Sequence, residues 1–289
     1  MEPNSSFINS YSKQLIEIIE NALNEDIGDG DHSTLACIDQ SAVGSAKLLV
    51  KENGIIAGVE LAEMIIKKLD PEAKFICYKF DGDTVAKGDL VFHIEASVHA
   101  LLSGERLLLN CMQRMSGIAT QTNNLVRIVS DYGVKLLDTR KTTPGIRLLE
   151  KWAVKIGGGH NHRFALYDMI MLKDNHIDHC GGITKAIHAT HNYLRSMNKS
   201  LKIEIEVRNV DELSEVLICG GVDRIMLDNF TPNEIENVIK LIPKEFETEA
   251  SGGITIENIQ EYAKTGIQYI SVGALTHSVK SLDLSLKAT

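Results

Sequence analysis

The feature that most constrains the fold is a series of short apolar segments in the second half of the chain. Six of them occur from Val134 onward, and most end in polar or charged residues: VKLLDTR, MIMLKD, KIEIEVR, DRIMLDN, ETEASGG and YISVGA. Helical or loop segments lie between them. Nearly continuous apolar strands that alternate with helices are typical of a parallel sheet covered on both faces. A weaker candidate strand at 156–163 brings the expected number to seven.

Two architectures agree with this pattern, an α/β barrel of the TIM type and an open doubly wound sheet. A doubly wound fold often carries G-x-G-x-x-G after its first strand, and no such motif follows the first strand here. The barrel is therefore preferred, and in a barrel the residues that end the strands surround one opening and carry the chemistry. These residues are Asp138, Arg140, Lys173, Glu206, Asp228, Ser251 and Gly273.

The first half of the chain has a different character. Apolar residues at helical spacing predict a helix over 12–27, with Ser12 as its N-cap and Gly28 as its stop. Residues 46–95 alternate β-rich runs with one helical segment, GVELAEMIIKKL, and predict a compact α+β unit. Residues 99–130 are helical again, with a break expected at Gly117.

Composition excludes several classes of protein. The hydrophobic fraction of 44% and the charged fraction of 24% are those of a globular protein, and the net charge of −9 gives no general attraction to nucleic acid or to an anionic membrane. Five cysteines without a Cys-x-x-Cys pair argue against a disulfide framework and a zinc ribbon. With no recognisable signal peptide or apolar span, we expect a cytoplasmic protein.

One basic segment interrupts the acidic chain. Between Asp138 and Asp174 there are seven basic residues and four acidic ones. Three of the basic residues follow Pro144 at helical spacing and are predicted to form a solvated helix face: Arg147, Lys151 and Lys155. The others lie at strand ends or in glycine-rich turns, where they can bind carboxylate or phosphate: Arg140, Lys141, Arg163 and Lys173.

Histidines in and after this segment allow two interpretations. A metal site could be built from His160 and His162, or from His176, His179 and Cys180, but neither group has a third ligand at a recognisable spacing. Hydrogen bonding to an anionic substrate is the preferred role for His162.

Carboxylates and small residues end the later strands. Glu206 and Asp228 are 22 residues apart, about one β/α unit, and suit either Mg²⁺ or ribose hydroxyls. An ion pair of these carboxylates with Arg208 or Arg224 is the structural alternative. Ser251-Gly252-Gly253 and Gly273-Ala274 follow the last two strands, where barrels often bind phosphate through backbone N–H groups.

These motifs resemble one enzyme family. The runs DTRKTTPGIRLLEKWAVKIGGGHNHR, MIMLKDNHI, EIEV, IMLDNF, SGGI and ISVGALTHS are similar to those of quinolinate phosphoribosyltransferases, as are EDIGDGDHST, GDTVAKGDLV and ERLLLNCMQRMSGIAT in the first half. The resemblance implies an N-terminal α/β sandwich at 1–112, with 278–289 packing back on it, and a seven-stranded open α/β barrel at 113–277.

The resemblance also implies an activity, the transfer of a phosphoribosyl group from 5-phosphoribosyl 1-diphosphate to quinolinate with decarboxylation, in NAD biosynthesis. It implies Mg²⁺, bound by Glu206 and Asp228 directly or indirectly, and at least a homodimer in which Arg106 reaches the neighbouring subunit's site. The residues implied for quinolinate are Arg106, Arg140, His162, Arg163 and Lys173. Those implied for the phosphoribosyl substrate are Lys141, Lys173, Glu206, Asp228, Ser251, Gly252, Gly253, Gly273 and His277, and Thr139 and Ala274 complete the substrate-binding set.

Within this set, the predicted catalytic residues are Lys141, Lys173, Glu206 and Asp228, and His160 is not expected to be catalytic. Three alternative functions remain at the level of the sequence. They are a related phosphoribosyltransferase for nicotinate or another aromatic acid, a Schiff-base aldolase that uses Lys173, and a non-catalytic protein that binds sugar phosphates.

Overall fold

The computed structural model describes residues 5–289 and divides into two compact units. The first unit comprises residues 1–123, 142–158 and 275–289, and the second comprises 124–141 and 159–274. The chain therefore passes between the units several times. The boundary predicted between residues 112 and 113 lies inside one long helix that spans 98–129, and it stays a prediction.

The first unit is built on a four-stranded sheet with the order β12-β1-β5-β3. Each neighbouring pair is antiparallel. The bounds are β1 (Val43–Val50), β3 (Lys74–Cys77), β5 (Leu90–Ser97) and β12 (Leu284–Ala288), and a small separate pair joins β2 (Gly54–Ile55) to β4 (Thr84–Val85). The C-terminal strand β12 thus pairs with β1, the first strand of the chain.

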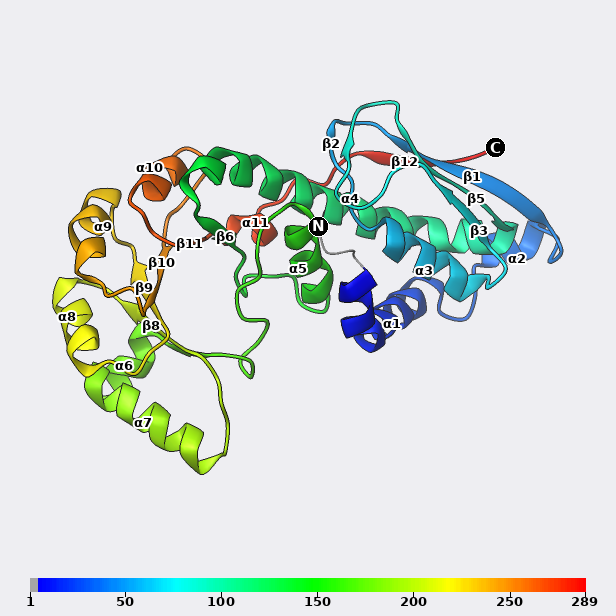
Figure 1. Cartoon of the computed structure of the whole chain (residues 1–289). Helices are drawn as coiled ribbons and strands as arrows, with labels where there is room; N and C mark the ends of the chain where they lie inside the picture. The colour runs from blue at the N-terminus through cyan, green and yellow to red at the C-terminus, as the bar shows by residue number, and fades with distance from the viewer. Residues whose placement is uncertain (1–4) are drawn as a thin grey trace. The chain divides into compact units, whose positions relative to one another are not determined.

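Helices α3 (Val59–Leu69) and α4 (Val98–Val129) lie beside this sheet (Figure 1). The other helices with residues in this unit are α1 (Ser5–Ile27), α2 (His32–Cys37), α5 (Arg147–Ile156) and α11 (Ala274–His277). Apolar residues of α3 and α4 share one core cluster with the sheet, among them Ile66 and Leu108 against Phe92. Residues 46–95 thus contain helix α3 and strands of this sheet, while the compact α+β unit as a domain stays a prediction.

Two predictions about helix ends need correction. Helix α1 begins at Ser5, and Ser12 follows a kink at Tyr11, whereas Gly28 ends the helix with a φ of 56° as predicted. Helix α4 runs through Gly117 without a break. A Cβ at Gly117 would lie 2.3 Å from the carbonyl oxygen of Lys280, so glycine is needed there for the close approach of another chain segment.

The second unit contains a six-stranded parallel sheet with the order β6-β11-β10-β9-β8-β7. The strands are β6 (Lys135–Leu137), β7 (Ile170–Leu172), β8 (Ile203–Val207), β9 (Arg224–Asp228), β10 (Glu247–Ser251) and β11 (Tyr269–Ser271). All six lie where the apolar segments predicted them. Helices connect the strands, as Figure 1 shows: α6 (Asp174–Cys180), α7 (Ile183–Ser196), α8 (Val210–Cys219), α9 (Pro232–Val238) and α10 (Ile259–Lys264). Two short 3-10 helices, η1 (Ser130–Tyr132) and η2 (Ile239–Leu241), complete the elements.

The predicted seventh strand is reduced to a single bridge. His160 pairs in parallel with Leu137, beyond β6 at the edge of the sheet. Ile156 is still part of α5, and Gly158 has a φ of 91°, which an extended strand cannot accommodate. The glycine run therefore forms a turn, and only one residue after it reaches the sheet.

No helix among the described residues is long and apolar enough to cross a membrane.

Candidate active site

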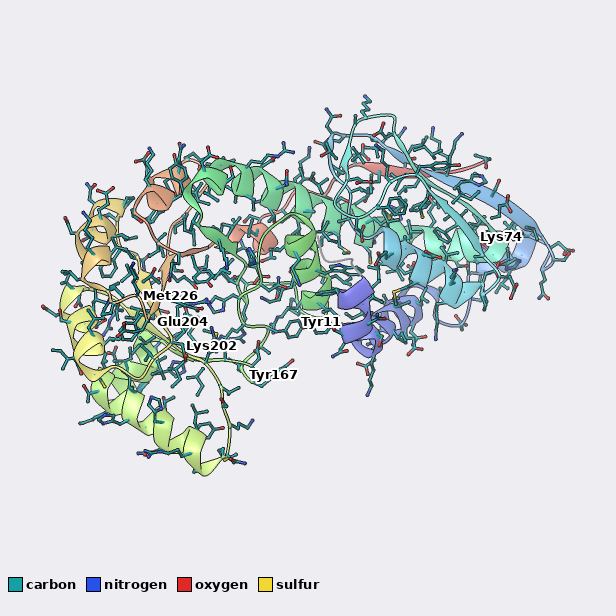
Figure 2. The ribbon with its side chains drawn as sticks, viewed as in Figure 1. Tyr11, Lys74, Tyr167, Lys202, Glu204 and Met226 are labelled. Carbon is teal, nitrogen blue, oxygen red and sulfur yellow. The ribbon has the colours of Figure 1, made fainter. Side chains whose placement is uncertain are left out.

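Strand register places three predicted site residues on one face of the sheet. Side chains alternate between faces along a strand, and residues paired in register share a face. Ser251 pairs with Asp228, and Glu206 pairs with Met226, two residues before Asp228. Glu206, Asp228 and Ser251 therefore lie on the same face, close to the carboxyl ends of three consecutive strands. Figure 2 shows Met226 and Glu204 on the neighbouring strands β9 and β8.

Lys173 joins the carboxylates of this face. It follows β7, and its Nζ lies 2.9 Å from Oε2 of Glu206. Burial raises the pKa of Asp228, the charge of Glu206 raises it further, and Lys173 opposes the effect. Two carboxylates therefore lie near one cation. Their remaining negative charge can attract another positive group or accept hydrogen bonds from hydroxyl donors.

The carboxylates of Glu206 and Asp228 are also possible ligands of Mg²⁺. Hard cations prefer carboxylate oxygens, and Asp228 also accepts a hydrogen bond from Nδ2 of Asn229 at 2.6 Å. The alternative of an ion pair with an arginine is not what the structure shows. Glu206 pairs with Lys173, and the two arginines have other partners: Arg208 contacts Asp178 and Glu212, and Arg224 contacts Glu247 and Glu249. The donor set fits Mg²⁺.

Arg140 and Arg163 form the cationic part of the site. Burial lowers the pKa of Arg163, and the positive charge of Arg140 lowers it further by a smaller amount. Nη1 of Arg163 donates to the carbonyl oxygen of Met169 at 3.1 Å, which orients its guanidinium. Arg163 is half-buried and Arg140 is exposed, and an anion that lies between two guanidinium groups offsets their repulsion. Lys141 is exposed nearby in sequence, and its backbone N–H donates to Oγ1 of Thr139.

Asp138 and His162 anchor the glycine-rich run to the sheet. Asp138 is fully buried at the end of β6 and accepts hydrogen bonds from the N–H of His162 at 2.8 Å and from Nδ2 of Asn161 at 2.6 Å. Nδ1 of His162 accepts from the N–H of Arg163 at 2.6 Å, which places the ring proton on Nε2. The buried carboxylate of Asp138 therefore fixes the conformation of residues 161–162 next to the sheet.

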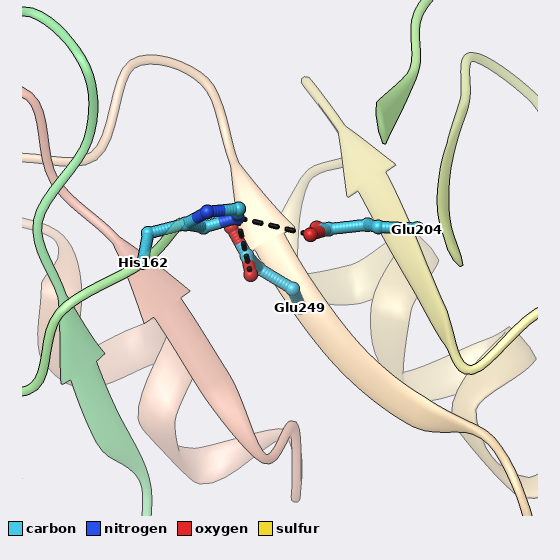
Figure 3. Close-up of side chains that lie close together, drawn as sticks. All are labelled: His162, Glu204 and Glu249. Atoms are coloured by element: carbon cyan, nitrogen blue, oxygen red, sulfur yellow. Dashed lines mark ion pairs between the residues drawn. The ribbon is translucent and has the colours of Figure 1, made fainter. Parts of the chain in front are cut away.

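His162 points at two buried glutamates that the sequence reasoning missed. Its Nε2 lies 3.0 Å from Oε2 of Glu204 and 3.5 Å from Oε2 of Glu249, as Figure 3 shows. These are close contacts between polar atoms without the alignment of a hydrogen bond. Burial is the main cause that raises the pKa of both Glu204 and Glu249 to about 7. The sequence does contain a signal for these two glutamates. Glu204 lies two residues before Glu206 and Glu249 two residues before Ser251, so each shares a face of a buried strand with a predicted site residue.

His162, Glu204 and Glu249 together have the donor atoms for a metal ion, since one ligand atom of each lies within 4.8 Å of the other two. Arg224 already supplies a cation there. Its Nη1 is 3.0 Å from Glu249 and 3.9 Å from Glu204, so we assign an ion-pair cluster. Elsewhere among the described residues, the histidines at 160, 176 and 179 and Cys180 form no metal-binding group.

The glycines after β10 have the conformation that the phosphate prediction requires. Gly252 has a φ of 97°, and a Cβ there would lie 2.2 Å from Oδ1 of Asn229. Gly253 has a φ of 61°, and a Cβ there would have no neighbouring atom within 4 Å among the described residues. Gly273 and Ala274 follow β11 and are partly exposed. Positive φ values at glycine are common in turns that bind phosphate through backbone N–H groups, so the phosphate site stays a prediction.

Two predicted residues belong to the first unit. Arg106 is exposed on α4 and lines a pocket of about 310 Å³ formed by α1, α4 and α5. His277 is exposed at the end of α11, and its Nδ1 lies 2.7 Å from Oγ of Ser278.

The predicted solvated face of α5 is wrong for one residue. Lys151 is 1% exposed, because this helix is buried along most of its circumference from Leu148 to Val154. The helix also starts later than predicted, at Arg147 with Ile146 as its N-cap, since Pro144 lies in the preceding turn.

Comparison with known proteins identifies the family. The sequence model described as "Quinolinate phosphoribosyl transferase, C-terminal domain" matches residues 118–287, and the model of the N-terminal domain matches 31–116. The chain belongs to the quinolinate phosphoribosyltransferase family. It is 44% identical over 276 residues to the probable nicotinate-nucleotide pyrophosphorylase (carboxylating) of Bacillus subtilis, covering 96% of this chain and 94% of that protein. It is 44% identical to quinolinate phosphoribosyltransferase (decarboxylating) 1b of Nicotiana tabacum, covering 93% of this chain and 81% of that protein.

Solved structures of the family have the same fold. NadC from Streptococcus pyogenes has a TM-score of 0.90 and 42% identity, with 96% of each chain covered. The nicotinate-nucleotide pyrophosphorylase from Francisella tularensis has a TM-score of 0.87 and 37% identity, also with 96% of each chain covered. The human nicotinic acid phosphoribosyltransferase, with a TM-score of 0.61 and 12% identity, is similar in fold alone. The structural neighbours thus agree with the sequence matches.

Proposed function

We propose that this family member transfers the phosphoribosyl group of 5-phosphoribosyl 1-diphosphate to the ring nitrogen of quinolinate. Diphosphate and CO₂ leave, and nicotinate mononucleotide is formed, a step of NAD biosynthesis. The observation that carries the proposal is the family match over both domains, with 44% identity to relatives named for this reaction. The site supports it because a pair of guanidinium groups, Arg140 and Arg163, and a pair of carboxylates, Glu206 and Asp228, follow or end strands of one sheet or adjoin its edge.

Quinolinate would bind to the cationic part. Arg140 and Arg163 can each grip a carboxylate with two parallel hydrogen bonds, and the half-buried position of Arg163 strengthens that contact. Lys173 and His162 are proposed to complete this side. Arg106 is proposed to come from a neighbouring subunit, which makes a homodimer the smallest functional assembly.

The phosphoribosyl substrate would bind to the carboxylate part. Glu206 and Asp228 would accept hydrogen bonds from the ribose hydroxyls or would hold Mg²⁺, and a bound Mg²⁺ would neutralise charge on the diphosphate. The turns at Ser251–Gly253 and Gly273–Ala274 present N–H groups to phosphate. Lys141 and Lys173 add point charges for the diphosphate as it departs.

The chemistry follows from this placement. The quinolinate ring nitrogen attacks the anomeric carbon while the C–O bond to diphosphate breaks, and diphosphate leaves with the bonding electrons. The ring nitrogen is then cationic, so it stabilises the electron pair left at the adjacent carbon when the carboxylate departs as CO₂. A proton takes the place of CO₂ on that carbon. Positioning and charge neutralisation supply most of the rate enhancement in such a reaction.

Two finer features of the fold are part of the proposal. The bridge at His160 extends the sheet beyond β6, while β7 forms its other edge. We infer that the sheet curves into an open barrel with the site at its carboxyl end, and that the first unit is the α/β sandwich of the family.

One assay tests the proposed function. Purified protein is mixed with Mg²⁺, quinolinate and 5-phosphoribosyl 1-diphosphate, and CO₂ and the mononucleotide are measured. We expect both products in equal amounts, and none when either organic substrate is omitted. Product from nicotinate without CO₂ would instead identify the related phosphoribosyltransferase. Borohydride trapping of Lys173 with a keto-sugar phosphate would identify the aldolase, and binding without turnover a non-catalytic protein. Leaving out Mg²⁺ shows whether the carboxylate pair needs the metal.

A further inference from the structure

We propose that Arg114 and Glu150 are positioning residues for the phosphoribosyl substrate, because they bind two chain segments that adjoin predicted substrate-binding residues. One segment follows Lys141 and the other precedes His277. This inference rests on the proposed function, which assigns Lys141 to that substrate, and on the family resemblance, which implies His277 for it. Neither Arg114 nor Glu150 is among the residues that the family resemblance implied.

The contacts form a closed circuit inside the first unit. Nε of Arg114, on α4, donates to Oε1 of Glu150, on α5, at 2.7 Å. Nη2 of Arg114 donates to Oγ1 of Thr143 at 3.0 Å and to the carbonyl oxygen of Thr276 at 2.9 Å. The circuit closes where the N–H of Thr143 donates to Oε2 of Glu150 at 2.9 Å. One guanidinium and one carboxylate thus tie together three segments that are far apart in sequence.

Burial makes this circuit strong. Glu150 is 1% exposed, Thr276 is fully buried, and the side chain of Arg114 is 29% exposed. A buried carboxylate requires partners, and here both of its oxygens have one. Charge-assisted hydrogen bonds in such surroundings are stronger than those at the surface. An exposed pair of the same unit, Lys68 with Glu20, has no comparable constraint, since both side chains are almost half exposed.

The two threonines lie at equivalent points of the chain path. The chain passes from the second unit to the first between Lys141 and Thr142, and again between Ala274 and Leu275. Thr143 and Thr276 are the second residues after these two crossings. No helix or strand occurs between the end of β6 and the start of α5, so side-chain contacts restrain that segment. Fixing Thr143 limits the positions open to Lys141, and fixing Thr276 limits those open to His277.

Steady-state kinetics of the full-length protein test this inference. Arg114→Met removes the guanidinium and keeps an apolar stem of similar length. We expect the KM for 5-phosphoribosyl 1-diphosphate to rise about tenfold, because Arg114→Met removes the hydrogen bonds that fix Thr143 near Lys141 and Thr276 next to His277. The KM for quinolinate should stay within about twofold, because the circuit does not hold the Arg140 and Arg163 side chains. Arg114→Lys, which keeps the charge but not the fork, should recover only part of the affinity.

Two further variants make the result decisive. Thr143→Val removes one exposed hydroxyl and should raise the same KM by about threefold, so it replaces Arg114→Met if that protein does not fold. Gln113→Leu is the matched control. Gln113 neighbours Arg114 on α4 and donates to the carbonyl oxygen of Leu284, away from both crossings. Its KM values should match those of the unmodified protein.

The inference is overturned if the Arg114 and Thr143 variants leave the KM for 5-phosphoribosyl 1-diphosphate at the control value. It is also overturned if both KM values rise together, since that indicates general loosening of the first unit. Failure of the proposed function has a different signature, because the unmodified protein would then release no CO₂ from quinolinate.

Discussion

A buried carboxylate in the first unit should make stability depend on pH. Asp81 follows β3, and its Oδ1 accepts a hydrogen bond from the N–H of Val59 at 2.8 Å, the first residue of α3. The residue is only half-buried as a whole, but its Oδ2 is out of contact with solvent and lacks a hydrogen-bond partner among the described residues. Burial raises the pKa of Asp81 to about 7, and the charge of Glu60 adds to the effect.

The sign and size of the effect follow from this pKa. An acid whose pKa is about 7 in the folded protein and 3.8 in the reference state keeps its proton longer when folded. The folded state is therefore favoured most at low pH, and that advantage is lost as pH rises from about 4 to about 7. At about 1.4 kcal/mol per pKa unit, the loss totals about 4 kcal/mol, of which about 3 kcal/mol falls between about pH 5 and about pH 8.

Asp81→Asn isolates this contribution. Asparagine keeps an oxygen acceptor for the N–H of Val59 and cannot ionise. We expect the free energy of unfolding of the variant to gain about 3 kcal/mol relative to the unmodified protein between about pH 5 and about pH 8. Urea unfolding followed by the fluorescence of Trp152, the single tryptophan, reports on the same unit. Asp83→Asn is the control, because the exposed Asp83 caps the N–H of Phe80 in the same loop. A difference between Asp81→Asn and the unmodified protein that stays constant across this pH range would refute the reasoning.

Three other predictions concern packing, the buried cluster and the anion site. Gly117→Ala should lower the free energy of unfolding by about 2 kcal/mol or more, because its Cβ would meet the backbone oxygen of Lys280, and thermal unfolding measures the loss. Arg224→Met should destabilise the second unit by about 3 kcal/mol, since it leaves the carboxylate of Glu249 buried without its cation. Hydrogen exchange of the β9 and β10 amides measures the loss, and unchanged protection would contradict the prediction. Arg140→Ala should raise the KM for quinolinate at least about tenfold, and an unchanged value would show that Arg140 does not bind the dicarboxylate.

Much of the molecule follows from local pattern. The alternation of apolar runs with helices located all six parallel strands, because a strand buried on both faces must be apolar for most of its length. Polar residues at the strand ends predicted that Lys173, Glu206 and Asp228 lie close together, since the fold class alone brings strand ends to one edge, and the structure confirms this proximity. Gly28 was identified as a helix stop because a positive φ is a local property of glycine.

Tertiary structure decided what depends on contacts between distant segments. The sequence marked Gly117 as a break, but its role is set by Lys280, and Lys151 has the charge of a surface residue although packing buries it. The pairing of Glu204 and Glu249 with His162 depends on strand register and on one turn of the glycine run. The circuit of Arg114 and Glu150 depends on the packing of α4 against α5. Hydrophobic period and turn chemistry act over a few residues, whereas the partners of a buried charge are selected by the whole fold.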